Sequence, residues 1–178
     1  IVGHTLGTPG FSVIEAIQLF HSAGLDGAEI IWQDDYSAAI PESGSEKLIS
    51  EIKSLAPDLG IEIVALTPYM SGYNSLETKD RRQDLDRLFR CLDVAAELGC
   101  QFIRVYAGSY KSGDTEHKEK WKFLVESLQF ANEAAQKAGI QLCVENHFNT
   151  MTVSAEQSAA LMKDVNLQNV GSLYDQAN

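Results

Sequence analysis

The feature of the sequence that most constrains its fold is a phrase that recurs four times. Each copy joins the end of a helical pattern, a glycine and a short apolar run: "SAGLDGAEII", "DLGIEIVAL", "ELGCQFIRVY" and "KAGIQLCVEN". The glycines, Gly24, Gly60, Gly99 and Gly139, lie 36, 39 and 40 residues apart. Glycine is favoured just after a helix because it accepts a left-handed backbone without a Cβ clash. A strand and a helix that repeat at this period predict the βα units of a parallel sheet.

The apolar runs predict six strands, which alternate with five helices. The strands are expected at residues 1–4, 27–32, 61–67, 101–107, 140–145 and 170–175. The helices are expected to begin after Ser12, near Ser45, near Lys79, near Thr115 and after Ser154. Two of these starts carry capping boxes, Ser12 with Glu15 and Ser154 with Gln157, in which each side chain bonds the other's backbone N–H.

Two architectures can be built from such units, a doubly wound open sheet and a (β/α)8 TIM barrel. The first strand runs into "GHTLGTPG", which lacks the Gly-x-Gly-x-x-Gly pattern, so a dinucleotide-binding sheet has little support. A barrel needs eight units and typically about 250 residues, whereas this chain has 178. We therefore predict one TIM-barrel domain over residues 1–178, which covers about six of the eight βα units and is cut short at its C-terminus.

Composition narrows the classes of partner. The net charge is −11, so the average field repels phosphate backbones and no nucleic-acid partner is expected. The sequence has no apolar run long enough to cross a bilayer and no secretory leader, so no membrane partner is expected. Three cysteines fit neither a disulfide framework nor a zinc knuckle, and predict reduced thiols in a cytoplasmic protein.

The polar residues of the later strands share one face. In "QFIRVY", Arg104 and Tyr106 alternate with Ile103, which is suited to packing under helices. Glu145 and Asp175 end the next two predicted strands on the same side as Arg104. In a barrel that side is the interior, and its carboxyl-end mouth is where active sites lie.

Glu145 and Asp175 should therefore converge, and two buried carboxylates close together cannot both stay ionised unaided. A divalent cation would resolve this, since oxygen ligands suit Mg²⁺ or Mn²⁺ and an added imidazole admits Co²⁺ or Zn²⁺. Arg104 could offset the charge instead, or be a structural ion-pair partner. The two carboxylates could also cap the helices that follow their strands.

Further residues near the strand ends are candidates for binding a substrate, and they are His4, Glu29, Tyr69, Tyr106 and His147. Each has a plainer interpretation. His4 is better explained as a structural residue than as a catalytic one, and His147 could simply bond its own loop backbone. Glu29 is either a ligand contact or an interior charge paired to a neighbour. The tyrosines, with Trp32, form either an aromatic wall for a sugar ring or ordinary packing.

Four runs, "GLDGAEI", "LGCQFIRVYAG", "GIQLCVENHFNT" and "NVGSLYDQAN", span essentially the whole chain in this order. Together they resemble the xylose isomerase-like TIM barrels, the sugar phosphate isomerase/epimerase superfamily. The resemblance implies one divalent metal ion (Mn, Mg, Co or Zn) at the barrel mouth. Glu145 and Asp175 match two of its four ligands, and Glu145 also matches one of the acid–base pair. The other ligands, a His and a Glu or Asp from later strands, would lie beyond Asn178.

The chemistry implied by this resemblance is proton abstraction from a carbon next to a carbonyl, with His147 and Arg104 contacting substrate oxygens. A metal-dependent sugar or polyol isomerase or epimerase is the first hypothesis. Many epimerases of the group have a His where this chain has Asn178, and "ENHFNT" resembles a segment of the dehydroshikimate dehydratases and of the inosose dehydratases. A dehydratase is therefore the second hypothesis, and a non-catalytic sugar-binding barrel the third. The expected partner is a small sugar or polyol, and a homo-oligomer is left open.

Overall fold

A computed structural model describes residues 1–111 and 113–178 of the chain. One sheet contains the strands β1 (Val2–His4), β2 (Gly27–Trp32), β3 (Ala39–Ile40), β4 (Glu62–Pro68), β5 (Phe102–Tyr106), β6 (Gln141–Glu145) and β7 (Val170–Leu173). Its order is β1-β2-β4-β5-β6-β7, all neighbours are parallel, and β3 pairs with β2 beyond the reach of β1. A doubly wound sheet reverses its order at a switch point. This sheet does not reverse, so its topology is that of a (β/α) barrel.

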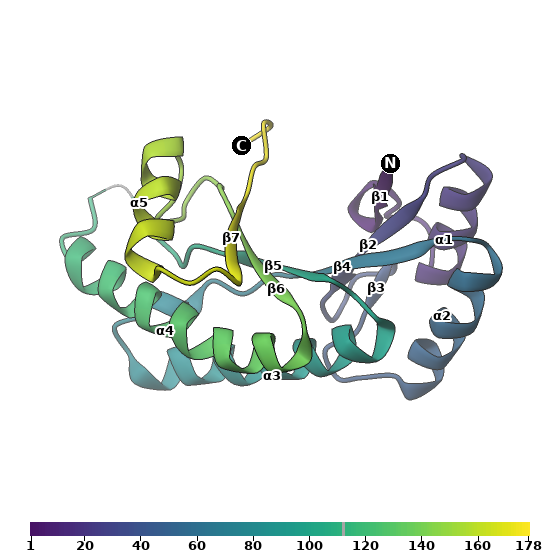
Figure 1. Cartoon of the computed structure of the whole chain (residues 1–178), viewed down its shortest axis with the longest axis horizontal. Helices are drawn as coiled ribbons and strands as arrows, with labels where there is room; N and C mark the ends of the chain where they lie inside the picture. Colours follow the sequence, from purple (N-terminus) through teal and green to yellow (C-terminus); the bar gives the residue numbers. More distant parts are fainter. Residues whose placement is uncertain (112) are drawn as a thin grey trace.

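Helices follow the outer side of the curved sheet (Figure 1). They are α1 (Val13–Ser22), α2 (Glu46–Asp58), α3 (Thr78–Leu98), α4 (His117–Ala138) and α5 (Ala155–Val165), with 3-10 turns η1 (Thr5–Gly7) and η2 (Gly72–Asn74). All five predicted helices are present, and none that the structure describes is long and apolar enough to cross a membrane. The sequence did not predict β3, because a strand of two residues carries no periodicity.

The helix ends form for the reasons that the sequence indicates. Ser12 and Glu15 make a capping box at α1, and Ser154 and Gln157 make one at α5. The recurring glycines adopt left-handed backbones, with φ of 74° at Gly99, for example, where α3 ends. Each unit therefore begins and ends through local chemistry, which sets the length of the repeat.

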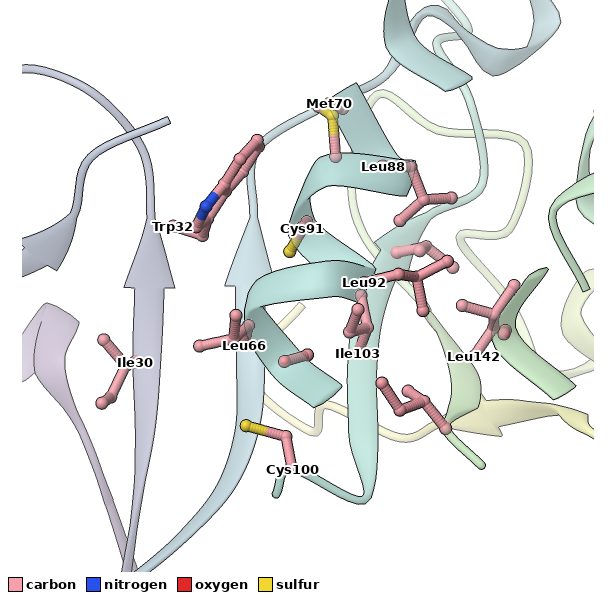
Figure 2. Packing of buried hydrophobic residues seen from close by; sticks show 14 of the residues in the cluster. Ile30, Trp32, Leu66, Met70, Leu88, Cys91, Leu92, Cys100, Ile103 and Leu142 are labelled. Atoms are coloured by element: carbon pink, nitrogen blue, oxygen red, sulfur yellow. The ribbon is translucent and has the colours of Figure 1, made fainter. Parts of the chain in front are cut away.

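The core lies between the sheet and the helices. Figure 2 shows side chains of α3 facing those of β4 and β5, with Leu88, Cys91 and Leu92 directed toward Leu66 and Ile103. Trp32 belongs to this buried cluster, so it packs in the core and does not line an aromatic wall. The opposite face of the sheet is left for the polar residues.

The last strand is shorter than predicted. β7 ends at Leu173, and neither Tyr174 nor Asp175 is part of the strand. The expected alternation stops there, because Leu173, Tyr174 and Asp175 all line the same cavity. Asp175 reaches the predicted side of the sheet through a side-chain contact described below, and not through the pleat of a strand.

Candidate functional site

The carboxyl ends of the strands open into a cavity of about 860 Å³. Its lining includes every residue that the sequence predicts as a site residue: His4, Glu29, Tyr69, Arg104, Tyr106, Glu145, His147 and Asp175. These residues lie in or directly after six different strands. Parallel strands bring them to one end of the sheet because all their carboxyl ends point the same way. The position is thus as expected, while the roles stay predictions.

Two carboxylates that line this cavity converge on one side chain. Nδ2 of Asn178 donates to Oε1 of Glu145 at 3.1 Å and to Oδ2 of Asp175 at 2.9 Å. Both oxygens therefore face a single point, which in this structure is taken by a hydrogen-bond donor. The convergence predicted for the two acidic residues is present.

Asn146 holds Asp175 in place. Its Nδ2 donates to the carbonyl of Asp175 at 2.8 Å, and its Oδ1 accepts from the N–H of Asp175 at 2.7 Å. The buried amide thus supplies a donor and an acceptor just where the β7 ladder has ended. The sequence did not predict this role for Asn146. One signal in the sequence was available. Asn146 stands between Glu145 and His147, so in an extended segment its side chain lies on the opposite face from theirs.

Arg104 lies beneath the carboxylates and is only 4% exposed. Its Nε is 3.4 Å from Oε2 of Glu145, and its Nη2 makes a long contact of 3.5 Å to the carbonyl of Thr67. The guanidinium carbon lies 4.4 Å from the ring centre of Tyr69 and 4.1 Å from that of Tyr106. Its Nη1 is buried without a hydrogen-bond partner among the described residues. The cation is therefore held largely by two aromatic faces.

Two glutamates of the cavity, Glu145 and Glu29, have a raised pKa. Burial raises the pKa of Glu145, and the charge of Asp175 adds to the rise, while Arg104 opposes both. Burial likewise raises the pKa of Glu29, again against the charge of Arg104. A carboxylate whose pKa is raised toward the working pH is suited to accepting and returning a proton.

His4 is held in its neutral form. Its Nδ1 accepts from the N–H of Leu6 at 2.9 Å, so Nε2 carries the proton and lies 3.1 Å from Oγ1 of Thr67. That hydroxyl can then donate to the carbonyl of Ile30 at 3.3 Å. Burial, and secondarily the charge of Arg104, lowers the pKa of His4 to about 4. Both ring nitrogens have protein partners, which supports the structural interpretation of His4.

His147 uses one nitrogen within its own turn. Its Nδ1 lies 2.7 Å from the carbonyl of Phe148, which makes Nδ1 the donor, so Nε2 is the acceptor nitrogen of the neutral ring. The imidazole lies against Tyr106, with ring centres 4.8 Å apart. His147 therefore bonds its own loop backbone and also lines the cavity.

The chemistry of the donors fits a divalent cation in part. Glu145 and Asp175 offer oxygens to one point, as a hard cation requires. Within residues 1–111 and 113–178, however, no three His, Cys, Asp or Glu side chains form a metal-holding group. Cys143 also lies on the inner face, but burial raises its pKa to about 11, so its thiol stays protonated. The described residues offer two convergent carboxylates and no complete set of ligands.

Comparison with known proteins identifies the architecture. The family model described as xylose isomerase-like TIM barrel matches residues 17–178. This chain belongs to that family. The predicted resemblance and fold class are thereby confirmed, and the xylose isomerase-like barrel places the cavity at the mouth where the strands end. No curated protein matches the chain by sequence.

Solved structures agree on the fold. A 3-keto-D-glucoside 4-epimerase from E. coli has a TM-score of 0.76 and 17% identity over 98% of this chain and 67% of its own. The IOLI protein with a binding zinc atom has a TM-score of 0.82 and 17% identity, over 96% of this chain and 60% of its own. A probable 3-DHS dehydratase from Bacillus anthracis has a TM-score of 0.74 and 19% identity, over 98% of this chain and 62% of its own. The xylose isomerase-like chain described here thus spans 60 to 67% of the length of these structures, which at such identities are similar in fold alone.

Proposed function

We propose that this protein is a metal-dependent sugar or polyol isomerase or epimerase in which Glu145 transfers the proton. The observation that carries the proposal is the convergence of Glu145 and Asp175 on one point of the cavity. Solved structures of similar fold include a D-psicose 3-epimerase in the presence of D-fructose and an L-ribulose 3-epimerase. Their substrates suggest the chemistry, since a cavity with paired carboxylates suits proton transfer next to a carbonyl.

Glu145 and Asp175 would hold the divalent cation, one of Mn, Mg, Co or Zn, and a solved structure of similar fold binds zinc. When bound, such an ion would polarise the carbonyl and neighbouring hydroxyl of the substrate. Glu145 removes the proton from the adjacent carbon, and the electron pair of the broken C–H bond moves to the carbonyl oxygen as an enediolate. Return of the proton to the former carbonyl carbon, while the hydroxyl proton passes to the former carbonyl oxygen, gives the isomer, and return of a proton to the opposite face of the original carbon gives the epimer.

The other residues of the cavity orient the reactants. Arg104, held by two tyrosine rings, keeps a positive charge 3.4 Å from the reacting carboxylate. Nε2 of His147, freed by the bond that Nδ1 makes, can accept a hydrogen bond from a substrate hydroxyl. Glu29, Tyr69 and Tyr106 line the same space and would contact the rest of the sugar.

A dehydratase is the second candidate. Asn178 stands three residues after Asp175, where many epimerases of the family carry the His noted above, and its amide bridges the two carboxylates. The first step would be the same, but the electron pair of the enolate would then expel the β-hydroxyl, which takes the proton held by Glu145 and leaves as water. The remaining alternative, a non-catalytic sugar-binding barrel, predicts sugar binding without proton exchange.

One experiment separates the three. The full-length protein is incubated in D₂O with Mn²⁺ and a panel of ketoses and keto-polyols, and the products are followed by NMR. Deuterium at a carbon next to the carbonyl with a rearranged product supports the isomerase, and loss of water supports the dehydratase. Binding without any exchange would overturn both enzymatic proposals. Elemental analysis of the purified protein tests the metal separately.

A further inference from the structure

Four side chains of the cavity come from two neighbouring strands, β5 and β6. Arg104 and Tyr106 stand two residues apart on β5, while Glu145 ends β6 and His147 follows two residues later. The register of the two strands pairs Tyr106 with Glu145. Side chains two apart in an extended chain share a face, so the four lie together. Both strands have a paired neighbour on each side, so this group does not lie at an edge of the sheet.

Tyr106 contacts two of the other three side chains with its ring. The guanidinium carbon of Arg104 lies 4.1 Å from the ring centre, and the ring centre of His147 lies 4.8 Å from it. Burial raises the pKa of Tyr106, against the charge of Arg104, so the ring is that of a neutral phenol. Such a ring attracts a cation to its face.

Few polar contacts of Arg104 and His147 could replace this ring. Nη1 of Arg104 is buried without a hydrogen-bond partner among the described residues, and its Nε is 3.4 Å from Glu145. The side-chain hydrogen bond of His147 goes to the carbonyl of Phe148, the next residue in the chain. Position within the cavity therefore depends on ring packing for both groups.

Tyr69 provides an internal comparison. Its ring centre lies 4.4 Å from the guanidinium carbon of Arg104, nearly as close as that of Tyr106. Its ring contact among the described residues is with Tyr106, at 5.9 Å, and not with His147. Two rings thus hold the cation, and one of them also holds the imidazole.

We propose that Tyr106 is a positioning residue whose single ring fixes Arg104 and His147 relative to each other. The charge beside the reacting carboxylate and the nitrogen that accepts from a substrate hydroxyl are then kept at one spacing. A misplacement of about 1 Å in such groups can cost about 10²-fold in rate. The inference rests on the proposed function for what these two groups do, and not for how they are held.

NMR of the full-length protein without substrate tests the two contacts. The guanidinium of Arg104 and the imidazole of His147 lie against the ring, so its ring current displaces their signals. Tyr106→Leu should return both signals toward their ordinary positions, and Tyr106→Phe, which keeps the ring, should leave both displaced. Tyr69→Leu should move the Arg104 signal and leave that of His147 in place.

Steady-state kinetics separates positioning from contact with the sugar. Tyr106→Leu should lower kcat by up to about 10²-fold with little change in KM. Combined with Arg104→Met, it should lose less than the product of the two single losses, because both changes release the same contact. Tyr110→Leu is the matched control, since Tyr110 contacts His117 and lies outside the cavity lining. It should move neither signal and leave turnover unchanged.

Signals that stay in place in Tyr106→Leu would overturn the proposal, and so would a loss confined to KM, which a wall for the sugar predicts. If Tyr106→Leu does not fold, Tyr106→Met carries the same expectations. Failure of the proposed function is a separate result. Signals that respond as expected in a protein that never exchanges deuterium leave the positioning intact and remove the reaction. Deuterium exchange with unmoved signals does the reverse.

Discussion

Two arginines on opposite sides of the sheet differ in how their guanidinium groups are paired. Arg87 lies on α3 outside the barrel, and its Nε donates to Glu42 at 2.8 Å while its Nη1 donates to Asp84 at 2.7 Å. Arg104 lies inside, where the nearest carboxylate oxygen is 3.4 Å from its Nε and its Nη1 is without a partner among the described residues. The outer cation is satisfied by its neighbours, and the inner one is not.

The ion pairs of Arg87 have a structural role. The pair around Arg87 ties the segment after β3 to α3, and Asp84 also accepts from the N–H of Gly72 in η2 at 2.7 Å. A buried donor left unpaired, as in Arg104, costs stability, and such groups are retained mainly where they serve a function. Both interpretations of Arg104, a structural ion-pair partner and a substrate contact, therefore stay predictions, which the variants below test.

The largest effect on turnover is expected when the carboxylate partners of the two arginines are replaced. Glu145→Gln removes the proton acceptor and should lower turnover by about 10²–10⁴-fold, as general-base removal does. Glu42→Gln, the same chemical change outside the barrel, should leave turnover intact and lower the free energy of unfolding. Steady-state kinetics and urea unfolding of both variants provide the measurement. Retained turnover in Glu145→Gln contradicts its assigned role.

The arginines themselves should differ next. Arg104→Met should lower kcat by about 10–10²-fold with little change in KM, since one charged contact to the reacting group is lost. Arg87→Met leaves two carboxylates without their cation and should cost about 1–3 kcal/mol of unfolding free energy. If Arg104→Met proved as destabilising as Arg87→Met and fully active, the contrast between the two would be lost.

A smaller effect is expected from the amide that holds Asp175. Asn146→Ala removes both hydrogen bonds to the Asp175 backbone and should weaken Mn²⁺ binding by about tenfold, the lower end for supporting residues of a metal site. Asn132→Ala is a comparison in α4, where a buried amide lies away from the cavity. Metal titration followed by electron paramagnetic resonance measures the affinity, and equal affinities in both variants would rule out a supporting role for Asn146.

The smallest effect concerns pH. Folding lowers the pKa of His4 from 6.5 to about 4, so its stabilising contribution is complete above pH 6.5 and is lost as the pH falls toward 4. Allowing for partial exposure, about 1–2 kcal/mol should disappear over this window. His4→Gln cannot titrate at this position. Its free energy of unfolding, measured with urea, should therefore fall less between pH 7 and pH 4.5 than that of the parent protein. Parallel losses in both proteins would mean that His4 does not contribute.

Short-range patterns were enough to determine the units of this fold. Ser12 and Ser154 announce helix starts, Gly99 and Gly139 mark helix ends, and Glu145 lies at a strand end in the sequence itself. These features depend on neighbours within a few residues, so the sequence displays them directly. Parallel pairing then brings the strand ends together whatever the details of packing.

Only the tertiary structure decided how the side chains meet. Trp32 follows two isoleucines, so alternation could not assign its face, and packing against the helices placed it in the core. Asp175 lies beyond its strand and depends on the amide of Asn146, 29 residues away. The neutral state of His4 and the aromatic support of Arg104 likewise need partners from distant strands. Such contacts depend on register and distance between strands, which no local pattern of residues encodes.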